Sequence, residues 1–414
     1  MKTLHLEPLT RVEGHGRVEL VLEGGELREA RVALLEAPRL FEGLLLGRSF
    51  AEVPALVCRI CAICSSVHRV TAAAALEDAL GVEVPAAAWR VRDLLLVGGH
   101  IESHALHLFC LVLPDLAGVP SVLELLREDH PAARGGLALK ALGNRIQEVA
   151  GGRAIHPVNV EVGGVLRLPE RSVLEGLRDD LAAWEARLPS VLEPFGDPAG
   201  YPPSSPVVGV GLCVKASAEV LLRGETLALA DGREVPVEGY HGLLSEQPSS
   251  YSNAKRAGEV LLTGALARQG REGLADSRPG GIHANNAAQA LELAWALERA
   301  RRLVDALLDA DPAAPLAGAV RPGAGVGTAA IEAPRGLLIH HYAIDDLGRV
   351  AVADIVTPTA VNQGAMEGQL LADLKGVDDE EELRARAERI VRAYDPCISC
   401  AVHVLNVGGC KPGG

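Results

Sequence analysis

The sequence predicts an α+β fold that is mainly helical, with long central helices and small β-sheets at the periphery. Apolar residues recur with helical periodicity over long stretches, above all at 86–113 and 284–310. Segments of alternating polarity are short and turn at Gly24-Gly25 and Asp231-Gly232. Aromatic residues make up only 3% of the chain, so leucine, valine and alanine must fill the core.

In the first half of the chain, residues 2–35 alternate in polarity around Gly24-Gly25, which predicts a β-hairpin. Pro85 precedes the longest apolar-periodic stretch, a favourable position for the start of a helix, and Gly81 ends the helix before it. The predicted helices are 40–52, 66–80, 86–113, 119–128, 134–150 and 170–191.

In the second half, proline-rich residues 197–206 predict a loop, and residues 207–240 predict strands. Residues 312–335 are rich in glycine, alanine and proline, which predicts a long loop of the kind that often carries function. The remaining predicted elements are a helix at 284–310, strands at 337–345 and 350–356 that turn at Asp346-Leu347-Gly348, and helices at 360–374 and 378–394.

The composition narrows the class of protein. The formal charge of −14 argues against nucleic acid and anionic membrane surfaces as partners. No apolar run is long enough to span a bilayer, and Glu7 and Pro8 interrupt the start of the chain, so no signal peptide is expected. We therefore expect a cytoplasmic protein.

Two motifs at opposite ends of the 414-residue chain carry the chemistry. Residues 59–68 contain Cys61 and Cys64, and residues 395–403 contain Cys397 and Cys400, each pair followed by a histidine. Two cysteines at this spacing can bind one ion from one turn, and four thiolates suit a soft metal. The two ends must therefore meet, and we expect one domain over residues 1–403.

These pairs leave several alternatives open. A structural zinc site is disfavoured because zinc ribbons place their pairs ~15–20 residues apart. A thioredoxin-like redox pair explains one motif but not two. An iron–sulfur cluster bound by four cysteines also fits the residue types.

The flanking residues resemble the large subunit of a nickel–iron hydrogenase. That family has Arg-x-Cys-x-x-Cys-x-x-x-His near its start and Asp-Pro-Cys-x-x-Cys-x-x-His at its end, and both motifs are complete here. Ala62 departs from the usual glycine. Further matching segments are Thr10-Arg11-Val12-Glu13-Gly14-His15, Phe41-Glu42 with Gly47-Arg48, Ile155-His156-Pro157 with Gly163-Gly164, and Glu332-Ala333-Pro334-Arg335-Gly336.

The resemblance implies the hydrogenase large-subunit fold and a Ni-Fe(CN)2(CO) centre. Cys61 and Cys397 would be terminal nickel ligands, and Cys64 and Cys400 would bridge nickel to iron. A magnesium ion would be bound by Glu42 and His403 together with a backbone carbonyl and waters, in keeping with the few protein ligands that magnesium takes. This ion would tie His403 to the N-terminal region.

The resemblance also implies roles around the metals. Heterolytic cleavage of dihydrogen needs a Lewis acid for the electron pair and a base for the proton. Arg335 would point its guanidinium at the open metal edge, and Glu13 would accept the proton. Asp395 would orient Arg335, and His68 would donate a hydrogen bond to a bridging sulfur.

Other candidates are better explained by packing. His100, His104 and His107 share one helix face, but no acidic partner is evident, so packed histidines are expected. Ser103 stands where many family members have aspartate. The Gly323–Gly327 run lacks the spacing of a dinucleotide loop. Ordinary buried thiols are expected at Cys58, Cys110 and Cys213.

The predicted function is reversible cleavage of dihydrogen into protons and electrons that pass to an iron–sulfur small subunit. Residues 94–115 and 264–268 look like the soluble cytoplasmic branch, which implies diaphorase-type electron-transfer subunits for nicotinamide or deazaflavin. The alternatives are a dihydrogen-sensing regulatory hydrogenase, a respiratory quinone-reductase subunit, which lacks these cysteines, and a structural zinc protein.

The resemblance finally implies maturation with nickel-insertion proteins and an endopeptidase. That endopeptidase would remove residues 404–414 after His403.

Overall fold

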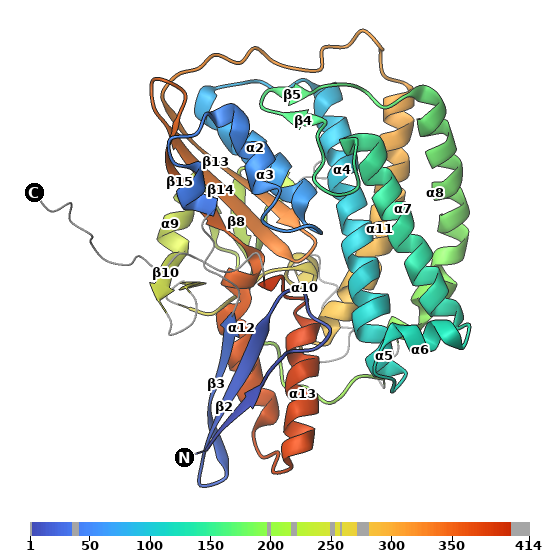
Figure 1. The fold of residues 1–414 in the computed structure, drawn as a ribbon, viewed down its shortest axis with the longest axis vertical. Coiled ribbons are helices and arrows are strands. Elements are labelled where there is room, and N and C mark those ends of the chain that lie inside the picture. The colour runs from blue at the N-terminus through green and yellow to red at the C-terminus, as the bar shows by residue number, and fades with distance from the viewer. Residues whose placement is uncertain are drawn as a thin grey trace, which may run out of the picture.

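The computed structural model describes residues 2–34, 41–196, 200–216, 222–248, 253–256, 259–270 and 281–398. Long helices dominate these residues, and several small sheets lie at their edges (Figure 1). The predicted α+β class is confirmed.

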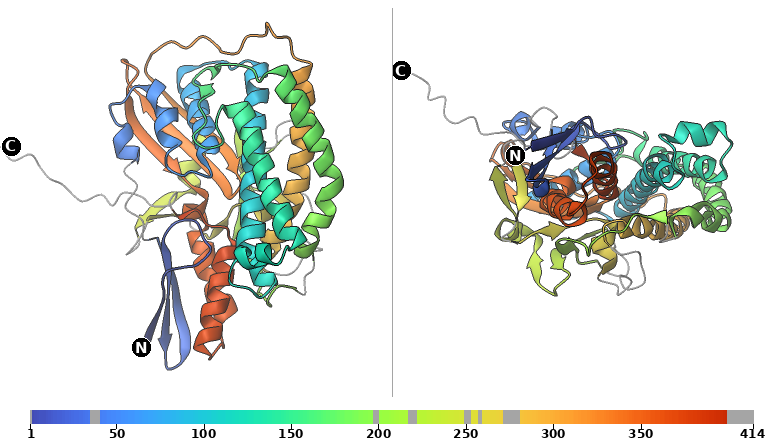
Figure 2. Two further views of the ribbon diagram at one scale, coloured as in Figure 1. Left: turned by 45° about the vertical axis from the view of Figure 1, so that its right-hand side comes forward. Right: turned by 90° about the horizontal axis from the view of Figure 1, so that it is seen from below.

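Four long helices lie side by side along one side of the molecule and form much of the largest apolar core (Figures 1 and 2). They are α4 (Ala86–Ala105), α7 (Pro131–Gly151), α8 (Arg171–Leu192) and α11 (Ala284–Leu308). Helices α4 and α7 approach closely because α7 has glycine at the contact. A Cβ on Gly143 would lie 2.4 Å from the backbone nitrogen of Glu102.

The central helix is not uniform. The predicted helix over 86–113 is regular as α4, continues as the π-helix η2 (Leu106–Val112), and ends in α5 (Leu113–Leu116). π-helical turns are rare and often occur at functional sites. The expectation that no apolar run is long enough to span a bilayer is wrong, because the stretch Ala86–Leu116 is apolar and long enough by length and composition alone. However, 83% of its apolar window is buried in the fold, which is the pattern of a core helix.

A four-stranded antiparallel sheet packs against helix α3 (Ser65–Leu80). Its strands are β15 (Val350–Val356), β14 (Gly336–Ile344), β13 (Gly325–Ala333) and β7 (Arg223–Gly224). The predicted loop over 312–335 is wrong for its second half, which is β13. That strand is rich in glycine because α3 lies against it: a Cβ on Gly325 would lie 1.8 Å from the carbonyl oxygen of Ala79.

The two ends of the chain share a second core. The sheet β1 (Lys2–Leu6), β2 (Gly16–Glu23) and β3 (Glu26–Leu34) turns at Gly24-Gly25 as predicted and packs on α12 (Pro358–Leu374) and α13 (Glu380–Ala393) (Figure 2). Leucine and valine side chains of the first strands and of the last helices form this core. The fold therefore brings the two cysteine motifs together, as their chemistry requires.

Shorter elements connect these units. The predicted helix over 40–52 is wrong, because Gly47 has a φ of 76° and the segment divides into α1 (Phe41–Leu45), the 3-10 turn η1 (Phe50–Glu52) and α2 (Val53–Val57). The other helices are α6 (Val122–Arg127), η3 (Glu193–Phe195), η5 (Val237–Gly239), α9 (Tyr240–Leu243) and α10 (Ala265–Gly270). The other strands are β4 (Val160–Glu161), β5 (Gly164–Val165), β6 (Val210–Val214), β8 (Thr226–Leu229), β9 (Glu234–Pro236), β10 (Ser245–Pro248), β11 (Asn253–Arg256) and β12 (Leu261–Leu262).

Candidate metal centre

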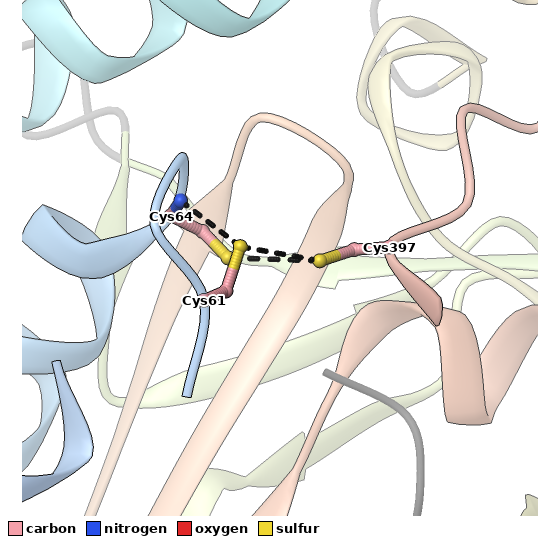
Figure 3. A group of neighbouring side chains, drawn as sticks. All are labelled: Cys61, Cys64 and Cys397. Atoms are coloured by element: carbon pink, nitrogen blue, oxygen red, sulfur yellow. Dashed lines mark hydrogen bonds between the residues drawn. The ribbon is translucent and has the colours of Figure 1, made fainter. Parts of the chain in front are cut away.

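Three cysteine thiols from the two ends of the chain meet in the interior (Figure 3). The sulfur of Cys397 lies 3.4 Å from that of Cys61 and 3.8 Å from that of Cys64. All three side chains are buried, and their sulfurs lie within 4.8 Å of one another. This spacing lets all three sulfurs bind one soft metal ion, so the residues present fit such a centre. Cys400 and His403 lie outside the described residues.

The first pair is held by its own segment. Cys61 lies between α2 and α3, and Cys64 is the N-cap residue of α3. The amide of Cys64 lies 3.4 Å from the sulfur of Cys61. The N-terminus of a helix stabilises nearby thiolates because its amides and its dipole are positive.

Cys397 of the second pair is held by segments that are distant in sequence. The amide of Cys397 donates to Thr359 Oγ1 in α12 at 2.8 Å, and the amide of Ile398 donates to the carbonyl of Glu13 at 3.1 Å. Glu13 and Cys397 also form a parallel β-bridge. The N-terminal motif therefore lies directly beside the C-terminal cysteine.

Arg335 lies in the turn between β13 and β14 and is buried beside the thiols. Its Nε donates to Asp395 Oδ1 at 3.0 Å. Burial works to lower the pKa of Arg335, but Asp395 and the three cysteine thiolates raise it well above its usual value. Its buried Nη1 has no partner within the described part of the chain, so this edge of the guanidinium can serve a ligand.

A second arginine fixes the turn that carries Arg335. Arg268 in α10 donates to the carbonyls of Ala333 at 3.1 Å and Pro334 at 3.2 Å. It also binds both carboxylate oxygens of Glu292 and one of Glu332. Burial opposes ionisation of Glu292, yet Arg268 holds its pKa well below the usual range. In the sequence, residues 264–268 only resemble the soluble branch of the family, and this resemblance does not predict the contact of Arg268 with the turn.

The other predicted site residues are placed as follows. Glu42 Oε1 accepts from the amide of Ile355 at 3.0 Å, so it lies against β15. His68 Nδ1 lies 3.1 Å from His340 Nε2, whose own Nδ1 lies 2.6 Å from the hydroxyl of Tyr342. A hydrogen bond from His68 to a sulfur stays a prediction.

The three histidines of the central helix are fully buried, as expected for packed side chains. The expectation that they lack an acidic partner is wrong, because His104 Nε2 lies 2.8 Å from Glu292 Oε2. Burial lowers the pKa of His104 and lowers that of His100 to about 3.

The remaining singled-out residues follow their predictions in part. Ser103, Cys58 and Cys213 are buried, whereas Cys110 is only partly so. The Gly323–Gly327 run leads into β13 rather than into a dinucleotide loop.

A buried thiol cluster beside a guanidinium edge that can still donate hydrogen bonds fits a soft-metal centre. Comparison with known proteins identifies which one. A family profile described as nickel-dependent hydrogenase matches residues 39–133 and 280–403, together just over half of the chain, and a second, described as HoxL-like, matches residues 3–37. The chain belongs to the nickel-dependent hydrogenase family.

Relatives agree along the whole length. The alpha subunit of sulfhydrogenase 2 from Pyrococcus furiosus is 38% identical, covering 98% of this chain and all of the relative. The alpha subunit of sulfhydrogenase 1 from the same organism is 36% identical, again covering 98% of this chain and all of the relative. The structure of an NAD+-reducing [NiFe]-hydrogenase in its H2-reduced state superposes with a TM-score of 0.81 at 28% identity, covering 97% of this chain and all of that one.

The chain is therefore the large, catalytic subunit of a nickel–iron hydrogenase, an oxidoreductase that acts on dihydrogen and pairs with a small subunit.

Proposed function

We propose that Cys61, Cys64, Cys397 and Cys400 together hold the nickel–iron centre, with one carbon monoxide and two cyanide ligands on iron. The main support for this proposal is that three buried sulfurs from opposite ends of the chain lie close together. When bound, this centre supplies the Lewis acidity that polarises dihydrogen. By the family resemblance, all four thiolates would hold the centre, with Cys64 and Cys400 as the ligands common to both metals.

Within this site, Arg335 and Glu13 act on the substrate. Arg335 keeps a buried, charged guanidinium next to the sulfurs, and Asp395 fixes its plane. Glu13, beside Cys397 through the β-bridge, takes the proton and passes it outward. His68 donates to a bridging sulfur and adjusts its basicity.

The same proposal includes a magnesium ion bound by Glu42 and His403. The support is the family resemblance and the position of Glu42 at β15, next to the segment that precedes α12. By the same resemblance, residues 1–403 form the mature single domain. An endopeptidase removes residues 404–414 after nickel-insertion proteins have delivered the metal.

The protein works in the cytoplasm, where electrons leave through an iron–sulfur small subunit to diaphorase-type partners. Supporting this are the relatives named above, one an NAD+-reducing hydrogenase and the others sulfhydrogenases. A dihydrogen-sensing regulatory hydrogenase has the same ligands, and steady-state turnover separates the two.

Elemental analysis of the complex with its small subunit tests the metal assignment. Nickel and iron are expected, with infrared bands for the diatomic ligands, whereas zinc without nickel would refute it. Glu13→Gln tests the proton route. The metals should stay bound while proton–deuterium exchange falls, because an amide neither takes up nor releases a proton at neutral pH.

Mass spectrometry of the active chain tests removal of the tail.

A further inference from the structure

Helix α11 presents a row of buried polar side chains to the site. Asn285, Gln289 and Glu292 lie at positions i, i+4 and i+7, which fall on one helix face. Asn285 Nδ2 donates to the carbonyl of Ala393 at 2.9 Å. Glu292 binds Arg268, which fixes the turn before Arg335. Polar groups are costly to bury unless they are paired, so the loss of any contact in this row would destabilise the fold.

The middle member of the row contacts the partner of Arg335. Gln289 Nε2 donates to Asp395 Oδ2 at 3.1 Å, while Asp395 Oδ1 accepts from Arg335 Nε. One carboxylate therefore lies between the amide and the guanidinium. All three side chains are at most 5% exposed, so water does not compete for these bonds.

His107, from the π-helix η2, contacts the other end of the amide. Its Nδ1 lies 2.5 Å from Gln289 Oε1, and its Nε2 lies 2.8 Å from the carbonyl of Arg392. Because the carboxylate of Asp395 only accepts hydrogen bonds, the NH2 group of Gln289 must face it and the amide oxygen must face His107. The same Arg392 carbonyl accepts from the backbone amide of Asp395 at 2.8 Å. The ring of His107 and Asp395 are therefore connected both through Gln289 and through this carbonyl.

The backbone of Asp395 has a φ of 50°, in the left-handed region that non-glycine residues rarely adopt, so contacts with the surrounding chain must stabilise it. Its carboxylate is held by two donors, Arg335 Nε and Gln289 Nε2. We propose that Gln289 is a positioning residue for dihydrogen cleavage: through Asp395 it sets the plane of the Arg335 guanidinium at the metal centre. This inference rests on the proposed role of Arg335 and Asp395.

The test uses Gln289→Met, which keeps the size of the side chain but cannot donate. Gln147→Met is the matched control, because Gln147 is also a fully buried glutamine that donates to a carboxylate, Glu102 Oε2 at 2.7 Å. The complex with its small subunit is assayed for dihydrogen oxidation, nickel content and the nickel electron paramagnetic resonance spectrum.

We expect Gln289→Met to retain nickel and to lose activity by about 10–100-fold, the usual effect of removing a group that orients a site residue. Its nickel spectrum should shift because the guanidinium charge moves, and the spectrum of Gln147→Met should not. In the double variant with Asp395→Asn, activity should fall no further than in Asp395→Asn alone, because both changes break one chain of contacts.

Two results would overturn the inference. One is near-normal activity with an unshifted spectrum in Gln289→Met. The other is a double variant whose losses multiply. If Asp395→Asn is itself fully active, the proposed role of the Arg335–Asp395 pair fails as well, so the two failures are distinguishable.

Discussion

The two cysteine motifs have the same spacing but are held in place by different means. The first is built by local structure: Cys64 caps the 16-residue helix α3, and the amide of Cys64 lies close to the sulfur of Cys61. The second depends on contacts with Thr359 and Glu13, which are distant in sequence. The comparison teaches that the first pair depends on contacts within its own segment, whereas the position of Cys397 depends on the packing of both chain ends.

The strongest test of this comparison is ligand loss on either side. Cys61→Ser and Cys397→Ser should both abolish nickel binding and activity, since a hydroxyl is a poor nickel donor. Nickel analysis and dihydrogen uptake measure this, with Cys213→Ser in β6 as the control that keeps both. If one of the two serine variants keeps full nickel, the motifs do not serve one centre.

A smaller loss of activity is expected at Arg335, which lies beside the thiols of the two cysteine motifs. Arg335→Lys should retain the metals but lower dihydrogen oxidation on the order of 100-fold, because a point charge replaces a planar fork. Arg301→Lys, at an exposed ion pair with Glu185 on the surface of α11, is the matched control. Unchanged uptake in Arg335→Lys would make this arginine a structural residue.

Two threonine substitutions test whether the second cysteine motif depends more than the first on contacts that are distant in sequence. Thr359→Val removes the acceptor for the buried amide of Cys397 and should cost about 1–3 kcal/mol of stability at the second motif. Nickel occupancy should fall with it.

Thr71→Val is the matched control, because Thr71 Oγ1 donates to the carbonyl of Val67 within α3 at 2.8 Å and contacts no ligand. Its nickel occupancy should stay at the level of the unaltered protein. Equal nickel loss in both variants would show that the second motif is no more dependent on distant contacts than the first.

The last test has no effect at neutral pH and concerns the response to acid of the helical side of the molecule, which packs against the first motif. His100 in α4 is buried, which lowers its pKa to about 3. Between pH ~6.5 and this value, His100 binds a proton in the unfolded chain but not in the folded protein. Stability should therefore fall as pH decreases from ~6.5 towards 3, by up to ~1.4 kcal/mol per pH unit for this residue. His100→Gln should flatten the dependence of unfolding on pH, and an unchanged slope would exclude His100 as its source.

The meeting of Cys61, Cys64 and Cys397 beside Arg335 could be predicted because each lies in a short motif whose spacing is itself the signal. β13 could not, because glycine and alanine, required where α3 approaches, are also the residues of loops. The partners in the site could not be predicted either. The contacts of Arg268, Gln289 and His107 join segments far apart in sequence. The available sign is the spacing of Asn285, Gln289 and Glu292, which places three polar residues on one face of the predicted helix at 284–310.

The π-helix η2 interrupts the longest helical segment between α4 and α5. An α-helix advances ~100° per residue and wider π-helical turns advance less, so the residues after Leu106–Val112 face a direction that a continuous α-helix would not give them. Asp115 lies just beyond the π-helix and binds both Arg11 and Arg392. A regular helix at this point would turn Asp115 away from these arginines, so the irregular turn connects the central helix to the N-terminal motif and to α13 at once.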